Sequence, residues 1–250
     1  MMKSYMFAGA LAALFVGSCA HAGDVKPDNE VSFNAALTSD YRYRGISQTR
    51  LKPAVQGGAD YVNNPTGLYV GTWLSTISWT RDAGGSGSIE WDIYAGKRGE
   101  IVKDVSYDVG VLTYVYPSNG LSGVPGFVSA NTTEVYGQLG YGPGTIKYSH
   151  AVTDLFGFVD SKNSGYLDIS ANFDVAAGTV LNLHAGHQEV KHSSAASYTD
   201  WKVGLTHDFG VVSGALAVIG TDASKSAYAS PANGKFLGKT ALLLTISKTF

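Results

Sequence analysis

The stretch VSFNAALTSDYRYR, residues 31–44, decides the fold class because its two kinds of residue alternate one for one. The odd positions are mostly apolar or aromatic, whereas the even positions become polar and end in Asp40, Arg42 and Arg44. Side chains of a β-strand point alternately to opposite faces, so this segment would have one apolar and one polar face. A strand of about ten residues or more is long enough to cross a bilayer when tilted.

Four later stretches repeat this alternation. They are IEWDIYAG (89–96), VSYDVGVLTYVY (105–116), LDISANFDV (167–175) and DWKVGLTHDF (200–209). A soluble β-sandwich would also alternate, but its strands are usually shorter, at about five or six residues. The length of the stretches and their charged faces therefore favour strands of a membrane barrel.

Turn residues divide the chain into about twelve such segments, an even number as in bacterial outer-membrane barrels. The predicted strands are 31–44, 53–62, 68–79, 89–97, 105–116, 132–142, 145–152, 166–175, 179–188, 198–209, 212–221 and 240–250. Short turns alternate with longer polar loops, of which 117–131 and 222–239 are expected at the cell surface. The sequence thus predicts an all-β fold, a transmembrane antiparallel β-barrel.

Composition agrees with one membrane-embedded domain. Only 15% of the 250 residues are charged, below the roughly 25% of a typical soluble domain, while glycine (31) and tyrosine (15) are frequent. A net charge of −2 provides no concentrated basic face, so nucleic acid is not expected as a partner. Past the N-terminal region, no apolar run approaches the roughly 18 residues of a spanning helix.

The two ends of the chain carry export and assembly signals. A lysine at position 3, an apolar stretch and an A-x-A arrangement at Ala20 and Ala22 predict a cleaved signal peptide, residues 1–22. The alternative is a lipobox in which Cys19 is lipidated. We expect a short periplasmic segment, 23–30, and a barrel over 31–250. The final alternation ending in Phe250 is typical of strands recognised by the barrel-insertion machinery.

Four blocks of the mature chain resemble the TorF family of proteobacterial porins. They are LTSDYRYRGISQT (37–49), PAVQGGADYVNNPTGLYVGTWLSTISW (53–79), EWDIYAG (90–96) and YLDISANFDV (166–175). The resemblance covers essentially the whole mature chain. It implies an outer-membrane β-barrel with a pore function and no established solute.

Candidate catalytic and metal sites are weak. His184 and His187 are three residues apart, which on a strand places them on opposite faces, so they would not share an ion. His192 and Ser194 form an H-x-S pair similar to that of outer-membrane lipid hydrolases, but they fall in a Ser/Ala-rich loop without a recognisable carboxylate partner. We therefore expect no enzyme activity, no metal and no cofactor.

Aromatic residues suggest two girdles at the membrane interfaces. The outer girdle would contain Tyr41, Tyr43, Trp79, Trp91 and Trp201, and the inner girdle Tyr61, Tyr141, Phe209 and Phe250. If Tyr41 and Tyr43 face lipid, then the charged residues between them face the bore.

The function expected from these features is a narrow outer-membrane channel for passive diffusion of small hydrophilic solutes or ions. Its pore-lining residues would be Asp40, Arg42, Arg44, Glu90, Asp92, Asp108 and Glu134, with opposite charges pairing across the bore. Outer-membrane lipid and the insertion machinery are the other expected partners, and association of barrels is possible. The alternatives are a barrel-type lipid hydrolase and a structural or adhesive barrel with a plugged lumen.

Overall fold

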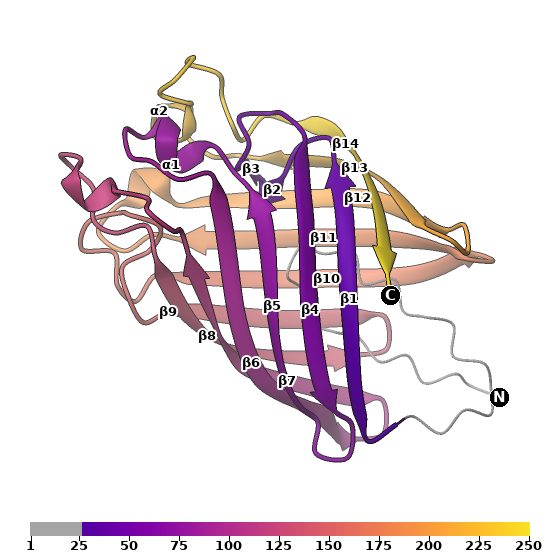
Figure 1. Ribbon diagram of the computed structural model, residues 1–250. Coiled ribbons are helices and arrows are strands. Elements are labelled where there is room, and N and C mark those ends of the chain that lie inside the picture. Colours follow the sequence, from indigo (N-terminus) through magenta and orange to yellow (C-terminus); the bar gives the residue numbers. More distant parts are fainter. Residues whose placement is uncertain (1–26) are drawn as a thin grey trace.

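The protein, described here by a computed structural model of residues 27–250, forms a closed barrel of twelve antiparallel strands (Figure 1). The wall strands are β1 (Asn29–Thr38), β4 (Ala54–Asn63), β5 (Leu68–Thr76), β6 (Ile89–Val102), β7 (Val105–Val115), β8 (Thr132–Tyr141), β9 (Gly144–Ala151), β10 (Gly165–Ala176), β11 (Thr179–Glu189), β12 (Tyr198–Asp208), β13 (Ser213–Thr221) and β14 (Ala241–Thr249). Each wall strand pairs with the next along the chain, and β1 closes the barrel against β14. The prediction of an all-β antiparallel barrel with about twelve strands is confirmed.

Three N-terminal predictions fall on residues that the structure does not describe. The signal peptide (1–22), lipidation of Cys19 and most of the segment 23–30 lie before residue 27. They stay predictions.

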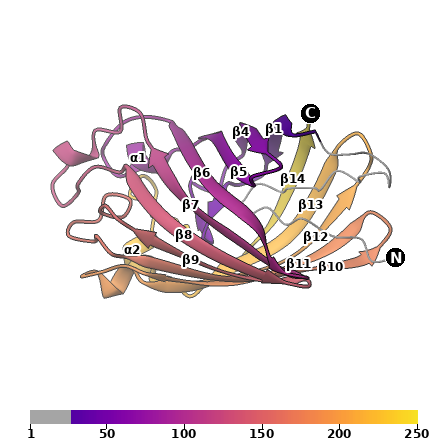
Figure 2. The same cartoon turned by 90° about the horizontal axis from the view of Figure 1, so that it is seen from below.

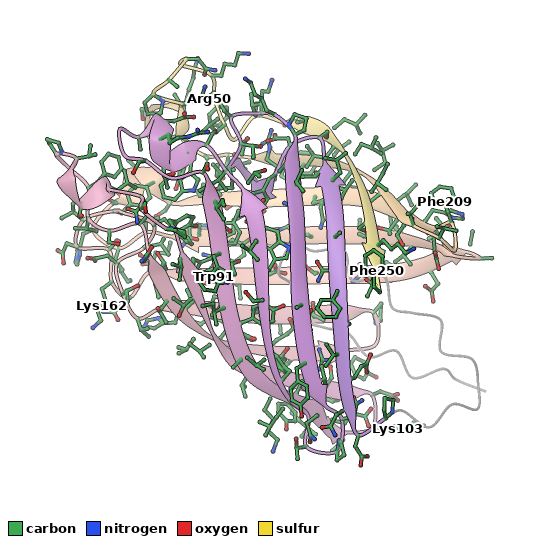
Figure 3. The ribbon with its side chains drawn as sticks, in the orientation of Figure 1. Arg50, Trp91, Lys103, Lys162, Phe209 and Phe250 are labelled. Atoms are coloured by element: carbon green, nitrogen blue, oxygen red, sulfur yellow. The ribbon has the colours of Figure 1, made fainter. Side chains whose placement is uncertain are left out.

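The two ends of the barrel differ in their connections. Short turns join the strands at one end, where Lys103 and Phe209 lie, and we call it the turn end (Figure 3). Longer connections join them at the opposite end, the loop end, where Arg50 and Lys162 lie (Figure 3). The short helices are α1 (Trp79–Asp82), α2 (Lys225–Tyr228), η1 (Leu121–Gly123) and η2 (Ser194–Ala196). Figures 1 and 2 show α1 and α2 at the loop end from two directions.

Side chains of the wall strands alternate between an apolar outside and a polar interior, as period-two patterning requires. On β10, for example, Ile169 is 54% exposed, whereas Asp168 beside it points inward. Large apolar side chains face outward on most strands, among them Val31, Val55, Val70, Ile93, Val109, Leu139, Ile146, Leu205, Leu216 and Leu244. No helix among residues 27–250 is both long and apolar enough to cross a membrane.

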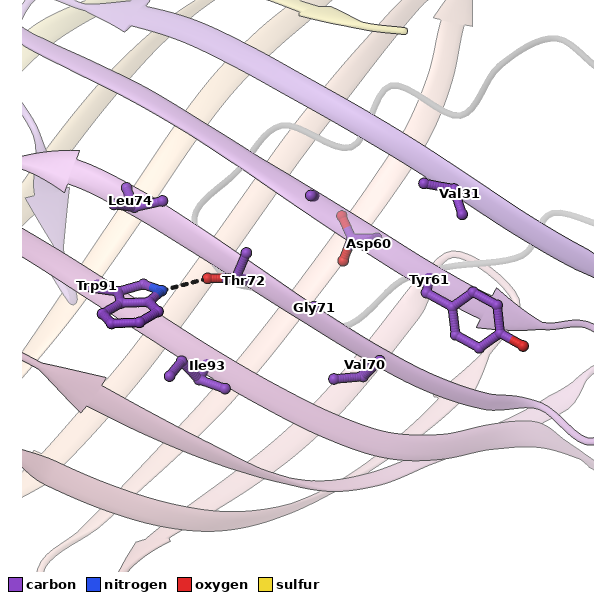
Figure 4. A pocket seen from close by; sticks show the side chains of 10 residues that line it. Val31, Asp60, Tyr61, Val70, Gly71, Thr72, Leu74, Trp91 and Ile93 are labelled. Atoms are coloured by element: carbon purple, nitrogen blue, oxygen red, sulfur yellow. Dashed lines mark hydrogen bonds between the residues drawn. The ribbon is translucent and has the colours of Figure 1, made fainter.

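A shallow hollow on the outer surface is lined by apolar side chains of β1, β4, β5 and β6 (Figure 4). The small side chain of Ala59 leaves this space between Val31, Tyr61 and Trp91. The indole Nε1 of Trp91 donates a 2.6 Å hydrogen bond to Oγ1 of Thr72 within it (Figure 4). This hydrogen bond satisfies the indole donor on an otherwise apolar surface.

The main departure from the predicted strands is at residues 39–53, because β1 ends at Thr38 instead of continuing to Arg44. The chain turns inward and forms a small hairpin of β2 (Arg42–Tyr43) and β3 (Ile46–Ser47). Its two-residue turn is Arg44-Gly45, with φ of 45° and 78°. Positive φ at both turn residues is what a type I′ hairpin turn requires, and glycine meets it without steric cost.

Part of the predicted outer girdle is wrong, because the chain turns inward after β1 and because β5 ends at Thr76, before Trp79 begins α1. Tyr41 is 4% exposed and lies inside the barrel, and Tyr43 and Trp79 pack against the same interior cluster. Trp91 and Trp201 face outward as predicted. The four residues of the predicted inner girdle are likewise exposed: Tyr61, Tyr141, Phe209 and Phe250.

Candidate functional site: the bore and its infolded segment

Residues 39–53, which we call the infolded segment, cross the bore and contact several walls. The Arg44 guanidinium donates to Oε2 of Glu134 on β8 at 2.7 Å and to Oε1 of Gln188 on β11 at 2.6 Å. On another side, Gly45 packs against β12, because a Cβ on it would lie 2.7 Å from that of Asp200. The segment is therefore held between distant strands rather than extending freely.

Two tyrosines attach the same segment to β6 and β7. The Tyr41 hydroxyl donates to Oε1 of Glu90 at 2.6 Å, and its ring meets Trp73 edge-on with centroids 5.4 Å apart. Tyr43 lies edge-on to Tyr114 at 5.5 Å, and their hydroxyl groups are hydrogen-bonded. These rings belong to the largest buried cluster of the described residues, so the segment packs as a core element would.

A second set of contacts stabilises the segment internally. Nε of Arg42 donates to Oδ2 of Asp40 at 2.6 Å, and the side chains are only 1% and 7% exposed. The hydroxyl groups of Ser47 and Thr49 donate to the other oxygen of Asp40. Nη1 of Arg42 also donates to the carbonyl oxygen of Leu237 at 2.9 Å, which joins the segment to the connection before β14.

Burial fixes the protonation of this segment. It raises the pKa of Tyr41 well above its ordinary value, and the negative charges of Glu90 and Asp92 raise it further. Burial alone would lower the pKa of Arg44, but the charge and hydrogen bond of Glu134 together with the nearby Tyr43 and Tyr114 outweigh burial, so the pKa is raised. Tyr41 therefore donates as a neutral phenol, whereas Arg44 remains a cation.

Charged residues of both signs form a row across consecutive strands of the inner wall. Strand register places Arg98 beside Asp108, then Gln138, Lys147 and Asp168. Two strands further along, the row ends at Asp200. We call the five ionisable members, which are Arg98, Asp108, Lys147, Asp168 and Asp200, the charge belt. Such a row suits an interior that contains water.

His184 on β11 connects the last members of this belt. Its Nδ1 lies 3.2 Å from Oδ2 of Asp168, and its Nε2 lies 2.9 Å from Oδ1 of Asp200. The Tyr166 hydroxyl donates to the other oxygen of Asp200 at 2.8 Å, and Ser170 donates to Asp168 at 2.6 Å. This network rigidly joins β10, β11 and β12.

Three basic side chains lie over tyrosine rings. Arg44 covers Tyr166, Lys147 covers Tyr136 and Arg98 covers Tyr69, with distances to the ring centroids of 4.2, 3.9 and 5.2 Å. Attraction to the ring faces holds these cations against the wall. Gly186 makes room for the Tyr166 ring, since a Cβ there would collide with it.

All seven residues predicted to line the pore lie inside the barrel, but three are not on its wall. The wall residues are Glu90, Asp92, Asp108 and Glu134, whereas Asp40, Arg42 and Arg44 belong to the infolded segment. The predicted pairing between arginine and wall carboxylate occurs for Arg44 with Glu134. Arg42 instead pairs with Asp40, because both lie on the turned segment. A pore-lining role for these residues stays a prediction.

Sequence reasoning missed several inward residues that the infolded segment contacts. Tyr166, Gln188 and Asp200 lie on the polar faces of their strands, so alternation could place them inside the barrel. Their proximity to Arg44 or Gly45 depends on strand register and on the inward turn, which the pattern does not contain.

The other candidate sites can also be located. His184 faces the bore, whereas His187 is exposed on the outer face, as the spacing indicates. His192 and Ser194 lie in the connection after β11, where Nδ1 of His192 is 2.8 Å from the carbonyl oxygen of Asp160. Within residues 27–250, no three His, Cys, Asp or Glu side chains are arranged to hold a metal ion.

A sequence comparison now identifies the family. The model of a bacterial family described as "Bacterial protein of unknown function (Gcw_chp)" matches residues 22–250. The chain belongs to this family. No match was found among curated proteins.

Solved porin structures share the fold. The chain is similar to the NanC porin, with 11% identity, a TM-score of 0.55, and coverage of 88% of this chain and 98% of that chain. It is also similar to the KdgM porin, with 5% identity, a TM-score of 0.52 and coverage of 88% and 97%. A KdgM porin "in complex with disordered oligogalacturonate" matches at 6% identity and a TM-score of 0.53, with coverage of 88% and 98%. At such low identity the likeness shows the fold, a twelve-stranded barrel of the porin type.

Proposed function

We propose that the protein is a non-enzymatic, porin-like channel of the outer membrane that lets small hydrophilic solutes or ions diffuse passively. The charge belt is the observation that carries this proposal, because a polar, charged inner wall inside an apolar-sided barrel is the pattern of outer-membrane channels. The porin-type fold supports it. We also propose that the protein is related to the TorF family of porins, which it resembles at residues 37–49 and 166–175 among other blocks.

The infolded segment is the proposed constriction of this channel. It crosses the bore and is attached through Arg44 to Glu134 and Gln188 and through Arg42 to Leu237. Removing both guanidinium groups should release the segment and widen the path.

Planar-bilayer conductance tests the proposal. The wild-type protein should form channels, and the double variant Arg42→Ala/Arg44→Ala should have a higher single-channel conductance and a shift of selectivity toward cations. Lys103→Ala, in the exposed turn between β6 and β7, is the control and should conduct like the wild type. A wild-type barrel that inserts but does not conduct would instead support a structural barrel plugged by the segment.

The lipid-hydrolase alternative receives a separate test. Residues His192 and Ser194 lie in a loop rather than on a lipid-facing strand, so the Ser194→Ala variant should leave lipid turnover unchanged. Loss of an esterase activity in that variant would refute the non-enzymatic proposal.

A further inference from the structure

The Asp92 carboxyl group on β6 has no cationic or hydrogen-bonding partner within the described part of the chain. Both carboxylate oxygens are buried and make no hydrogen bond within residues 27–250, and the residue is 0% exposed. Its register neighbours are Trp73 on β5 and Tyr114 on β7, neither of which is a cation. An isolated buried carboxylate is strongly unfavourable unless a cation or a proton neutralises it.

Glu90 is a second buried carboxyl group, two residues earlier on the same inner face. It is 1% exposed, and its Oε1 accepts a hydrogen bond from the neutral Tyr41 hydroxyl. Among the described residues it makes no ion pair within 4 Å. Glu134 differs, because Arg44 neutralises it. Within residues 27–250, therefore, neither Glu90 nor Asp92 is paired with a cation.

The inner wall as a whole carries more acidic than basic side chains. Its buried or half-buried charges, over residues 27–250, comprise eight acidic residues against three basic residues and one histidine. The acidic set is Asp60, Glu90, Asp92, Asp108, Glu134, Asp168, Asp200 and Asp208, and the other set is Arg98, Lys147, Lys202 and His184. The infolded segment adds one acidic and two basic residues inside the barrel, which reduces the acidic excess without removing it.

We propose that Asp92, with Glu90 as its neighbour, makes the bore selective for small cations over anions. The inference rests on the proposed channel function and assigns the ion class that the channel prefers. A charge buried from water is weakly screened, so its field extends into the bore, and carboxylates act in this way in cation-selective pores. The site lies where the infolded segment crosses, since Tyr41 of that segment bonds to Glu90.

The test is the reversal potential of the wild-type protein and its variants in planar bilayers across a potassium chloride gradient. Asp92→Asn should lower the cation-to-anion permeability ratio by about fivefold, as expected for loss of one weakly screened unit charge. Glu90→Gln should lower it in the same direction. Asp92→Glu, which keeps the charge, should retain the selectivity.

Asp104→Asn is the matched control, because it makes the same chemical change in the exposed turn between β6 and β7, where water screens the charge. It should leave the ratio unchanged. Each variant is first checked for folding by its heat-modifiable gel mobility.

Different failures have different meanings. If the wild-type barrel inserts but never conducts, both the channel function and this inference are wrong. If it conducts and Asp92→Asn keeps the wild-type ratio, the channel stands and the inference alone is overturned, because Asp92 then carries a proton. An equal effect of Asp104→Asn would also overturn it, since the site would not be specific.

Discussion

Removing the Arg44 side chain should destabilise the barrel far more than loss of a surface ion pair. Among residues 27–250, Arg44→Ala leaves Glu134, whose side chain is 2% exposed, with only the Tyr114 hydroxyl at 3.2 Å as a hydrogen-bond partner. Breaking a buried pair by deleting one partner costs about 3–5 kcal/mol. This cost already includes the lost contacts with Gln188 and the Tyr166 ring, because the same Arg44 side chain makes all of them.

Urea unfolding of the barrel in lipid vesicles, followed by tryptophan fluorescence, measures this free energy. The stranded charge causes most of the cost, so neutralising it should restore stability. The double variant Arg44→Ala/Glu134→Gln should therefore be more stable than Arg44→Ala alone, with a coupling energy of about 1.5–3 kcal/mol. Lys191→Ala is the control, since its pair with Glu189 is 40% and 51% exposed, so that water screens the two charges.

Two results would refute this reasoning. A cost of Arg44→Ala below about 1 kcal/mol would show that water reaches Glu134. Additive effects of the two substitutions would show that the pair is not coupled across the bore.

Three further predictions follow from orientation and burial. Ile169→Arg should impair folding into lipid by about 2–4 kcal/mol, whereas Asp168→Asn should be milder; equal effects would contradict the assigned faces of β10. On intact cells, an impermeant thiol reagent should label Ser122→Cys but not Ser230→Cys, since Ser122 is exposed and Ser230 is 1% exposed; labelling only after cell breakage would reverse the proposed orientation. Burial raises the pKa of Tyr41 in the folded protein, so Tyr41 ionises at a lower pH in the unfolded chain than in the folded one. The contribution of Tyr41 to stability is therefore complete below about pH 10 and falls as the pH rises above that value. In urea titrations, the Tyr41→Phe variant should therefore lose less unfolding free energy at alkaline pH than the wild type does. An equal loss in the two proteins would show that Tyr41 does not cause it.

The wall strands could be predicted because their pattern has a single physical cause. Strand side chains alternate faces, and the solvents on the two faces of this barrel wall differ, so every wall strand repeats the same period. The pattern in LDISANFDV predicts that Ile169 and Asp168 face opposite ways, and the structure has them so. Turn residues then gave the twelve strands to within a few residues at most boundaries.

The infolded segment was mispredicted because its alternation has a different cause. Residues 40–44 alternate aromatic and charged side chains, as a membrane strand would, but the aromatic ones pack against Trp73 and Tyr114 rather than lipid. The charged ones are satisfied by each other or by the wall. Only the Arg44-Gly45 pair carried a contrary signal, because glycine is favoured in a type I′ turn.

The candidate site depends on information that alternation lacks. Alternation identifies which side chains face inward, but only register and strand tilt decide which of them meet, and a shift of two residues would preserve every face while changing every neighbour. The sequence predicted that Arg44 and Glu134 both lie inside the barrel. It could not predict that Asp92 lacks a cationic neighbour, because that depends on the register that places Trp73 and Tyr114 beside it. The interior of such a barrel is therefore better described by how each charge is neutralised than by which charges are present, and Asp92 is where this distinction has a functional consequence.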